Sequence, residues 1–294
     1  MKRIFFCCSC LIMYQSYLFA QLDTIYGPKL QIRKSFENII DKGKPASLSF
    51  MIPVGAGNYY SINGAVALEL TGLAENSVTT FDAFAVYNRN NKIKKEQNQY
   101  KLGLAVDNVH RCNSNLKFST TLSAEYVNNV KDTTQSIASQ LYLDPRFALK
   151  KFFRIGLPVS DFHNKRIIPL LNLIPGLEYK YSYKASQDDH TGSIARFYFS
   201  PSISIYYRVR EKYKDEKSPF ANLFGASFRY TFRKDFYNST KIAEGYLPLY
   251  NFSLAYYPLK QDTFSLEAAY LFGSDPVNDL EKQEYWEFTI KIKK

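Results

Sequence analysis

Beyond its first twenty residues the sequence has one cysteine and no long hydrophobic run, and each shortage excludes a class of protein. Cys7, Cys8 and Cys10 lie near the N-terminus, so Cys112 has no intramolecular partner once that region is removed. A fold held together by disulfides is therefore excluded for the rest of the chain. Transmembrane helices are also excluded, because no apolar run there reaches about 18 residues.

The first twenty residues have the composition of an export signal. Lys2 and Arg3 precede a largely apolar run, residues 4–19, and cleavage is predicted after Ala20. The alternative is an uncleaved anchor helix, but the run contains polar residues and is shorter than the roughly 20 residues that a membrane span needs. We expect residues 1–20 to be removed on export.

The chain carries an excess of positive charge and many aromatic residues. It has 38 Lys and Arg against 27 Asp and Glu, a formal net charge of +11. The basic residues are spread along the chain and form no compact patch, which disfavours nucleic-acid binding and favours anionic lipids or anionic solutes. A mean hydropathy of −0.30 together with 24 Tyr and 23 Phe is typical of strands that have one polar and one apolar face.

From residue 47 onward, apolar residues recur at every second position. Near the C-terminus, Trp286, Phe288 and Ile290 lie on one side of an extended chain, and Glu287 and Thr289 lie on the other. Period two is the spacing of a β-strand with one apolar face. The pattern predicts about twelve strands, with ten to fourteen compatible, in residues 47–54, 62–71, 79–88, 100–106, 116–126, 137–143, 171–181, 194–208, 224–233, 249–257, 264–272 and 285–293.

These strands predict an all-β fold, an antiparallel transmembrane β-barrel over residues 47–294. A tilted strand crosses a bilayer in about 9–11 residues, which matches the predicted lengths. Apolar side chains would then face lipid and polar ones the interior, with both chain ends on the periplasmic side. The same topology predicts long outer loops at 88–98, 182–193, 234–245 and 273–284.

Two regions do not follow the alternating pattern. Residues 21–46 are predicted to form an N-terminal periplasmic segment. Within it, Pro28–Asp41 fits a short amphipathic helix that acts as a plug or latch, or a partly ordered leader to the first strand, which we favour. Residues 144–166 have no sustained period, and 147–157 fit either an additional strand or a short helix.

Three prolines conflict with the strand prediction. Pro175, Pro201 and Pro248 lie inside or at the edge of proposed strands. Proline has no N–H to donate to a β-ladder, and a closed ring has no free edge. Each proline therefore needs a bulge or a position near the rim.

The export signal, the alternating strands, the polar loops and the aromatic last strand together resemble the outer-membrane β-barrel proteins of Gram-negative bacteria, porins among them. The resemblance covers nearly the whole mature chain and rests on pattern, not on a motif. It implies an outer-membrane location, contact with outer-membrane lipids and insertion by the barrel-assembly machinery. The chain departs from the pattern in ending with Ile292, Lys293 and Lys294, where many such barrels end in an aromatic residue.

The sequence offers little catalytic or metal-binding chemistry. All three histidines, His110, His163 and His190, fall in predicted turns or loops. A barrel phospholipase would need Ser, His and Asn together on a lipid-facing wall, and no predicted strand carries a histidine. His110 and Cys112 are two ligands where a structural zinc needs four. We therefore expect no catalytic residue, no metal site and no cofactor.

The predicted interior is charged. Arg196, Arg229 and Arg233 come from neighbouring strands and form a basic wall. Charges inside a barrel must be hydrated or paired, so they either line a water-filled pore or close the interior as a salt-bridge core. The predicted pore-lining residues are Arg196, Arg208, Arg229, Arg233, Glu178, Lys180, Glu267, Glu287 and Lys291, and the predicted aromatic girdle consists of Tyr250, Tyr256, Tyr270 and Trp286.

Three functions fit this pattern. The first, which we favour, is a passive outer-membrane channel for small hydrophilic solutes with a mild preference for anions. The second is a non-conducting barrel whose surface loops bind partners, or which assists assembly or secretion. The third is a barrel hydrolase such as a phospholipase. The sequence specifies neither the solute nor the oligomeric state.

Overall fold

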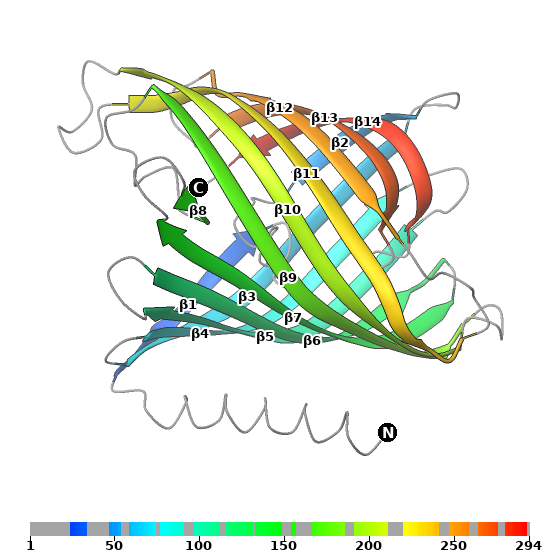
Figure 1. Ribbon diagram of the computed structural model, residues 1–294. Helices are drawn as coiled ribbons and strands as arrows, with labels where there is room; N and C mark the ends of the chain where they lie inside the picture. Colours follow the sequence, from blue (N-terminus) through cyan, green and yellow to red (C-terminus); the bar gives the residue numbers. More distant parts are fainter. Residues whose placement is uncertain are drawn as a thin grey trace.

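The chain forms one twisted sheet of fourteen strands that curves around a common interior (Figure 1). The computed structural model describes residues 24–33, 47–53, 59–74, 77–90, 97–111, 116–131, 133–148, 154–156, 166–185, 191–210, 220–240, 247–258, 264–275 and 280–292. The strands are β1 (Thr24–Arg33), β2 (Ser47–Pro53), β3 (Tyr59–Ala74), β4 (Ser77–Asn90), β5 (Gln97–Arg111), β6 (Leu116–Asn129), β7 (Thr134–Ala148), β8 (Arg154–Ile155), β9 (Ile167–Lys184), β10 (Gly192–Arg210), β11 (Phe220–Asn238), β12 (Leu249–Tyr256), β13 (Phe264–Asp275) and β14 (Leu280–Ile292). Within these ranges no helix is long and apolar enough to cross a bilayer.

Twelve of the fourteen strands, all except β1 and β8, pair in a closed circuit. Strands that follow one another along the chain are antiparallel neighbours from β2 to β7 and from β9 to β14, and β7 pairs directly with β9. The circuit is completed by β2, which pairs with β14 along Ser47–Pro53 and with β3 along Ser47–Met51. The prediction of an antiparallel all-β barrel of about twelve strands is confirmed.

Strand β1 extends the row that β2 occupies. One edge of β3 pairs with β2 over Tyr59–Asn63 and with β1 over Ala65–Leu73. The two short strands thus lie end to end beside β3, and residues 34–46, which connect them, are outside the described residues. β3 is the one pairing partner of β1 in the part of the chain that the structure describes, so the sheet is open along the other edge of β1.

The prediction of a helix from Pro28 to Asp41 is wrong for residues 28–33, which belong to β1. Leu30 and Ile32 point outward and are 72% and 66% exposed, while Lys29 pairs with Glu69 of β3. The edge of β3 offers backbone partners in register with this alternation, and ladder hydrogen bonds satisfy the groups that a helix would otherwise pair internally. The rest of that segment and the predicted export signal, residues 1–20, lie outside the described residues.

Every predicted strand is present, and most extend further than the sequence pattern indicated. The segment predicted at 137–143 becomes β7, and the segment predicted at 224–233 becomes β11. Three of the predicted outer loops are too long for the same reason, since those at 88–98, 182–193 and 273–284 shrink to the connections 91–96, 185–191 and 276–279, whereas the loop predicted at 234–245 shifts to 239–248. Loop residues with polar side chains continue the ladder because backbone pairing does not require an apolar face.

Apolar side chains face outward and polar side chains face inward, the reverse of the arrangement in a water-soluble protein. On β5, Leu102 and Leu104 point outward and are 60% and 51% exposed, whereas Gln99 and Lys101 point inward and are 0% exposed. In water, this arrangement would leave apolar surface hydrated and would bury charge, and both are unfavourable. Hydrocarbon outside removes the first cost, and polar partners inside reduce the second. The outer face is therefore suited to the apolar part of a bilayer.

Pro175 marks a split in the wall. β7 and β9 pair only as far as Tyr142 and Gly176, and Pro175 is the next residue of β9. Beyond that point β8 lies between the two strands, antiparallel to β7 and parallel to β9. Since proline cannot donate to the ladder, the two strands separate there and β8 takes over part of the pairing. The region predicted as an additional strand or a short helix thus contributes a two-residue strand.

The other two prolines also lie at irregular positions. The pairing of β10 with β11 is interrupted at Ser200 and Pro201 and resumes in the same register at Ser202, while Pro201 remains opposite Leu173 of β9. Pro248 lies directly before β12, and its carbonyl accepts a hydrogen bond of 3.0 Å from the N–H of Ser274. Both arrangements leave no ladder donor missing at a proline.

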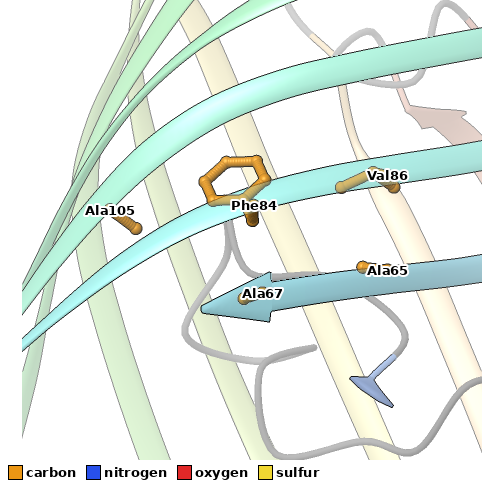
Figure 2. Packing of buried hydrophobic residues seen from close by; sticks show 5 residues of the cluster. All are labelled: Ala65, Ala67, Phe84, Val86 and Ala105. Carbon is orange, nitrogen blue, oxygen red and sulfur yellow. The ribbon is translucent and has the colours of Figure 1, made fainter. Parts of the chain in front are cut away.

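Rings on the inner face lie against glycines of the next strand. A β-carbon added at Gly103 would lie 2.5 Å from Phe84 Cζ, and one added at Gly176 would lie 2.5 Å from Tyr142 Cδ1. Each ring and its glycine are register partners, so the missing side chain is what makes room for the ring. Figure 2 shows the first ring in a small apolar cluster of the interior, made of Ala65, Ala67, Phe84, Val86 and Ala105.

We expect Gly176→Ala to destabilise the barrel by about 1–3 kcal/mol, the usual cost of overpacking. The new methyl group would meet both the Tyr142 ring and the Leu141 carbonyl oxygen, at 2.5 and 2.6 Å. Gly225→Ala is the matched control, because its nearest neighbour is the Tyr206 ring at 3.1 Å. Thermal unfolding followed by circular dichroism measures both, and equal midpoints for the two variants would contradict the packing argument.

We expect Leu102→Arg to lower the stability of the lipid-embedded barrel by about 2–4 kcal/mol, the cost of an arginine facing the middle of a bilayer. At a water-exposed position the same change would be nearly neutral. Urea titration of the protein refolded into lipid vesicles, with the single Trp286 as fluorescent reporter, distinguishes the two cases. An unchanged midpoint, or wild-type protein that stays monodisperse without detergent, would show that this face does not contact lipid.

Candidate functional site on the inner face of the barrel

Strands β9, β10 and β11 place charged residues at neighbouring positions of the inner face. The register pairs Glu178 with Arg196 and Arg196 with Asp235, and it pairs Tyr198 with Arg233. Directly opposed residues of antiparallel strands share a face, so all five side chains project into the interior. The pair Arg196–Asp235 continues the register of Tyr198–Arg233, and the register shifts only beyond it, between Arg196 and Ala195.

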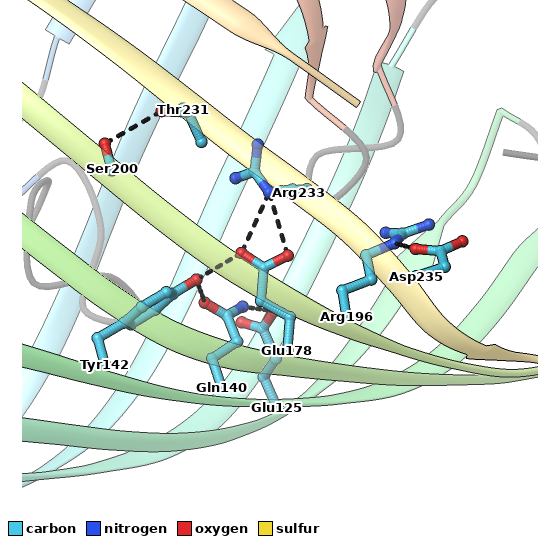
Figure 3. Close-up of polar contacts among 9 residues, drawn as sticks. All are labelled: Glu125, Gln140, Tyr142, Glu178, Arg196, Ser200, Thr231, Arg233 and Asp235. Carbon is cyan, nitrogen blue, oxygen red and sulfur yellow. Dashed lines mark hydrogen bonds and ion pairs between the residues drawn. The ribbon is translucent and has the colours of Figure 1, made fainter. Parts of the chain in front are cut away.

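Two ion pairs result from this register (Figure 3). Arg196 Nε lies 2.6 Å from Asp235 Oδ1, and Arg233 Nε lies 3.2 and 3.1 Å from the two carboxylate oxygens of Glu178. The guanidinium of Arg233 also lies 5.1 Å from the centroid of the Tyr198 ring. Glu178, Arg196 and Arg233 are each at most 5% exposed, so these charges are neutralised by protein groups rather than by water.

A chain of polar contacts continues from Glu178 along the wall to β5. The Tyr142 hydroxyl lies 2.9 Å from Glu178 Oε1 and 2.8 Å from Gln140 Oε1, and it donates its one proton to either. The Gln140 amide lies 3.5 Å from Glu125 Oε1, and Lys101 Nζ lies 3.6 Å from the same oxygen. The network therefore connects β5, β6, β7, β9 and β11. The carboxylates of Glu178 and Glu125 and the ammonium group of Lys101 each have a protein partner.

The interior is not equally accessible on all sides. The inner residues of β4–β7 are almost fully buried, and those at most 2% exposed are Asp82, Gln99, Lys101, Ala105, Thr121, Ser123, Asn129, Gln140 and Tyr142. Partly exposed polar residues of the interior include Ser227, Arg229, Asn251, Ser253, Glu267 and Glu287 on β11–β14, and Glu69, Asn172, Lys180 and Ser204 on β3, β9 and β10. Water-accessible polar positions thus include a continuous set along β11–β14, beside the ion-pair network, and further positions on β3, β9 and β10.

The structure brings some of the predicted pore-lining residues together and separates others. The buried ones are Glu178, Arg196, Arg208 and Arg233, the partly exposed ones are Lys180, Arg229, Glu267 and Glu287, and the side chain of Lys291 lies outside the described residues. The first group is concentrated on β9–β11, where pairing occurs, while Glu267 and Glu287 lie on β13 and β14. That these residues line a pore stays a prediction.

The predicted girdle residues all lie on the outer face, each against another aromatic ring. Tyr270 and Trp286 have ring centroids 5.1 Å apart, and Tyr250 lies 5.0 Å from Tyr230. The fourth, Tyr256, lies 5.1 Å from Phe224. Their role at the membrane interface stays a prediction.

Three residues of the network were missed by the sequence analysis. Asp235 falls in the loop predicted at 234–245, although the period-two run through Arg229 and Arg233 continues to it. Gln140 and Tyr142 lie in the predicted strand 137–143, which is short and contains no charged residue. The alternation was a usable signal for Asp235, whereas Gln140 and Tyr142 acquire their role only through the register with β9.

The expectation that no strand carries a histidine is wrong. His110 lies in β5, where it pairs in register with Ser77 and with Phe118, whose ring centroid is 5.3 Å away. Neighbouring Asn108 donates its side-chain amide to Thr79 at 2.8 Å. Among the residues that the structure describes, no three His, Cys, Asp or Glu side chains are grouped to hold a metal ion. His163, His190 and Cys112 lie outside those residues.

No protein-family model matches the chain, and no curated protein matches it. Among solved structures, it is similar to the NanC porin, with 10% identity over 85% of this chain and 100% of that one and a TM-score of 0.46. It is also similar to the β-domain of the Bordetella autotransporter BrkA, with 8% identity over 84% and 98% of the two chains and a TM-score of 0.39. It is similar as well to the outer-membrane channel DcaP of Acinetobacter baumannii, with 6% identity over 90% of this chain and 97% of that one and a TM-score of 0.37. At these scores the likeness adds no argument to the strand pairing described above.

We expect Glu178→Gln to destabilise the barrel by about 3–5 kcal/mol, because it leaves the buried Arg233 without its counter-charge. Glu287→Gln is the control, since Glu287 is partly exposed and accepts a hydrogen bond from Thr289 at 3.4 Å. Chemical unfolding of Glu178→Gln, of Arg233→Met and of the two combined gives the coupling between the partners, with Glu287→Gln measured beside them. Equal, small losses for Glu178→Gln and Glu287→Gln would mean that the pair is not buried as described.

Proposed function

We propose that the chain is a Gram-negative outer-membrane barrel that acts as a passive channel for small hydrophilic solutes. The observation that carries the proposal is the polar, partly water-accessible inner surface on β11–β14, set inside a wall whose outer side chains are apolar. A closed ring with this distribution of side chains fits a bilayer in which solutes pass along the polar side.

The burial of the inner residues of β4–β7 favours a channel that is narrow. On those strands the inner face is taken up by side-chain contacts such as the network from Lys101 to Glu178. Solute would therefore move along β11–β14, where hydroxyl, amide and charged groups replace part of its hydration. A passage of this kind passes small solutes and excludes bulky ones.

We expect the purified barrel, inserted into planar lipid bilayers in potassium chloride, to produce discrete conductance steps. Liposome swelling should show uptake of small sugars and little uptake of larger oligosaccharides, because width limits passage. Vesicles without protein and vesicles with heat-denatured protein are the controls. A barrel that is shown to be inserted and folded but stays silent over a range of voltages would exclude the channel and favour a non-conducting barrel that acts through its loops.

The hydrolase alternative retains one observation, the register pairing of His110 with Ser77 on β4 and β5. The nearby Asn108 donates its side-chain amide to Thr79 and not to His110, so this asparagine does not orient the histidine. Incubation with labelled phospholipid distinguishes the channel from the hydrolase. Hydrolysis by the wild type that is lost in His110→Ala would support the hydrolase.

A further inference from the structure

Arg229 differs from the other inward arginines on β10 and β11. Arg196 and Arg233 are buried and paired with Asp235 and Glu178, whereas Arg229 is partly exposed. Among the described residues no carboxylate lies within ion-pair distance of Arg229. Its charge is therefore available to the water-accessible side of the interior.

The surroundings of Arg229 are neutral hydrogen-bonding groups. Its register partners are Ser202 on β10 and Asn251 on β12. Two positions away along its own strand lie Ser227 and Thr231, which share the inner face because alternate residues of a strand do. Small hydroxyl and amide side chains leave space in front of the guanidinium that large or apolar ones would fill.

These neutral groups are themselves held in place by contacts around the arginine. Ser227 Oγ lies 2.7 Å from Ser253 Oγ, and Ser200 Oγ lies 3.2 Å from Thr231 Oγ1. The strand between Arg229 and the acidic residues Glu267 and Glu287 is β12, whose inner face carries Asn251, Ser253 and Ala255. A neutral strip thus separates the positive position from the negative ones.

We propose that Arg229, with Ser202 and Asn251 beside it, is the contact point for the carboxylate of a small hydroxylated solute inside the barrel. Arginine presents a planar fork of donors that matches a carboxylate, and the hydroxyl and amide groups around it suit the hydroxyls of the same solute. The inference rests on the proposed channel function and deepens it by naming a solute class and the residue that selects it.

The test compares wild type, Arg229→Gln and Lys234→Gln in bilayers that separate unequal potassium chloride solutions. Lys234 is exposed on the outer face of the same strand, so its loss removes the same charge from outside the interior. We expect Arg229→Gln to lower the ratio of anion to cation permeability about threefold, the effect of one charge acting through water over ~6 Å. Lys234→Gln should leave that ratio at the wild-type value.

Liposome uptake of glucuronate and of glucose provides a second readout, because the two solutes differ mainly by a carboxylate. Wild type should take up glucuronate faster relative to glucose than Arg229→Gln does. Arg229→Lys keeps the charge without the planar fork, so it should preserve ion selectivity and reduce the glucuronate preference. This variant also keeps the inference testable if Arg229→Gln fails to fold.

The outcomes separate the two proposals. A conducting barrel whose selectivity and glucuronate preference are the same in Arg229→Gln and in Lys234→Gln overturns the role of Arg229 and leaves the channel standing. A folded wild-type barrel that conducts nothing overturns the channel and the solute site with it.

Discussion

In hydrocarbon every backbone N–H and C=O must find its partner within the protein, and this requirement governs the rest of the structure. It explains why the chain closes into a ring and why polar loop residues continue the ladders beyond the alternating segments. It also explains why Pro175, Pro201 and Pro248 fall at a split, at an interruption of one ladder and next to a strand end. At the split β8 substitutes for the missing pairing between β7 and β9. The irregular features of the wall are thus local ways of satisfying the backbone hydrogen bonds.

The interior follows a second requirement, that buried charge must be compensated. Register decides how this is met, because it determines which side chains oppose one another across neighbouring strands. On β9–β11 it opposes acids and arginines and so produces ion pairs. At Arg229 of β11 it places Ser202 of β10 on one side and Asn251 of β12 on the other, and so leaves a charge next to water. The same strand therefore contributes to a closed region and to an accessible one.

The alternation of the sequence was sufficient to predict the fold class, the strands and the face on which each side chain lies. It placed Arg196 and Arg233 inside, yet it did not identify Asp235 as a partner, because partnership depends on the register between β10 and β11. It also did not anticipate β1, since the amphipathic pattern around Leu30 and Ile32 fits a helix as well as a strand until the edge of β3 is known. Local pattern specifies orientation, whereas neighbours between distant segments are specified only by the assembled sheet.

The seam of the ring is formed by segments from opposite ends of the polypeptide, with β14 meeting β2 and β1 continuing the row of β2 along β3. A fragment that lacks β14 could not close the ring. It would expose the unpaired strand edges of β2 and β13, which could pair with another copy of the fragment. Closure of the ring therefore depends on β14, because no other strand that the structure describes joins β2 to β13.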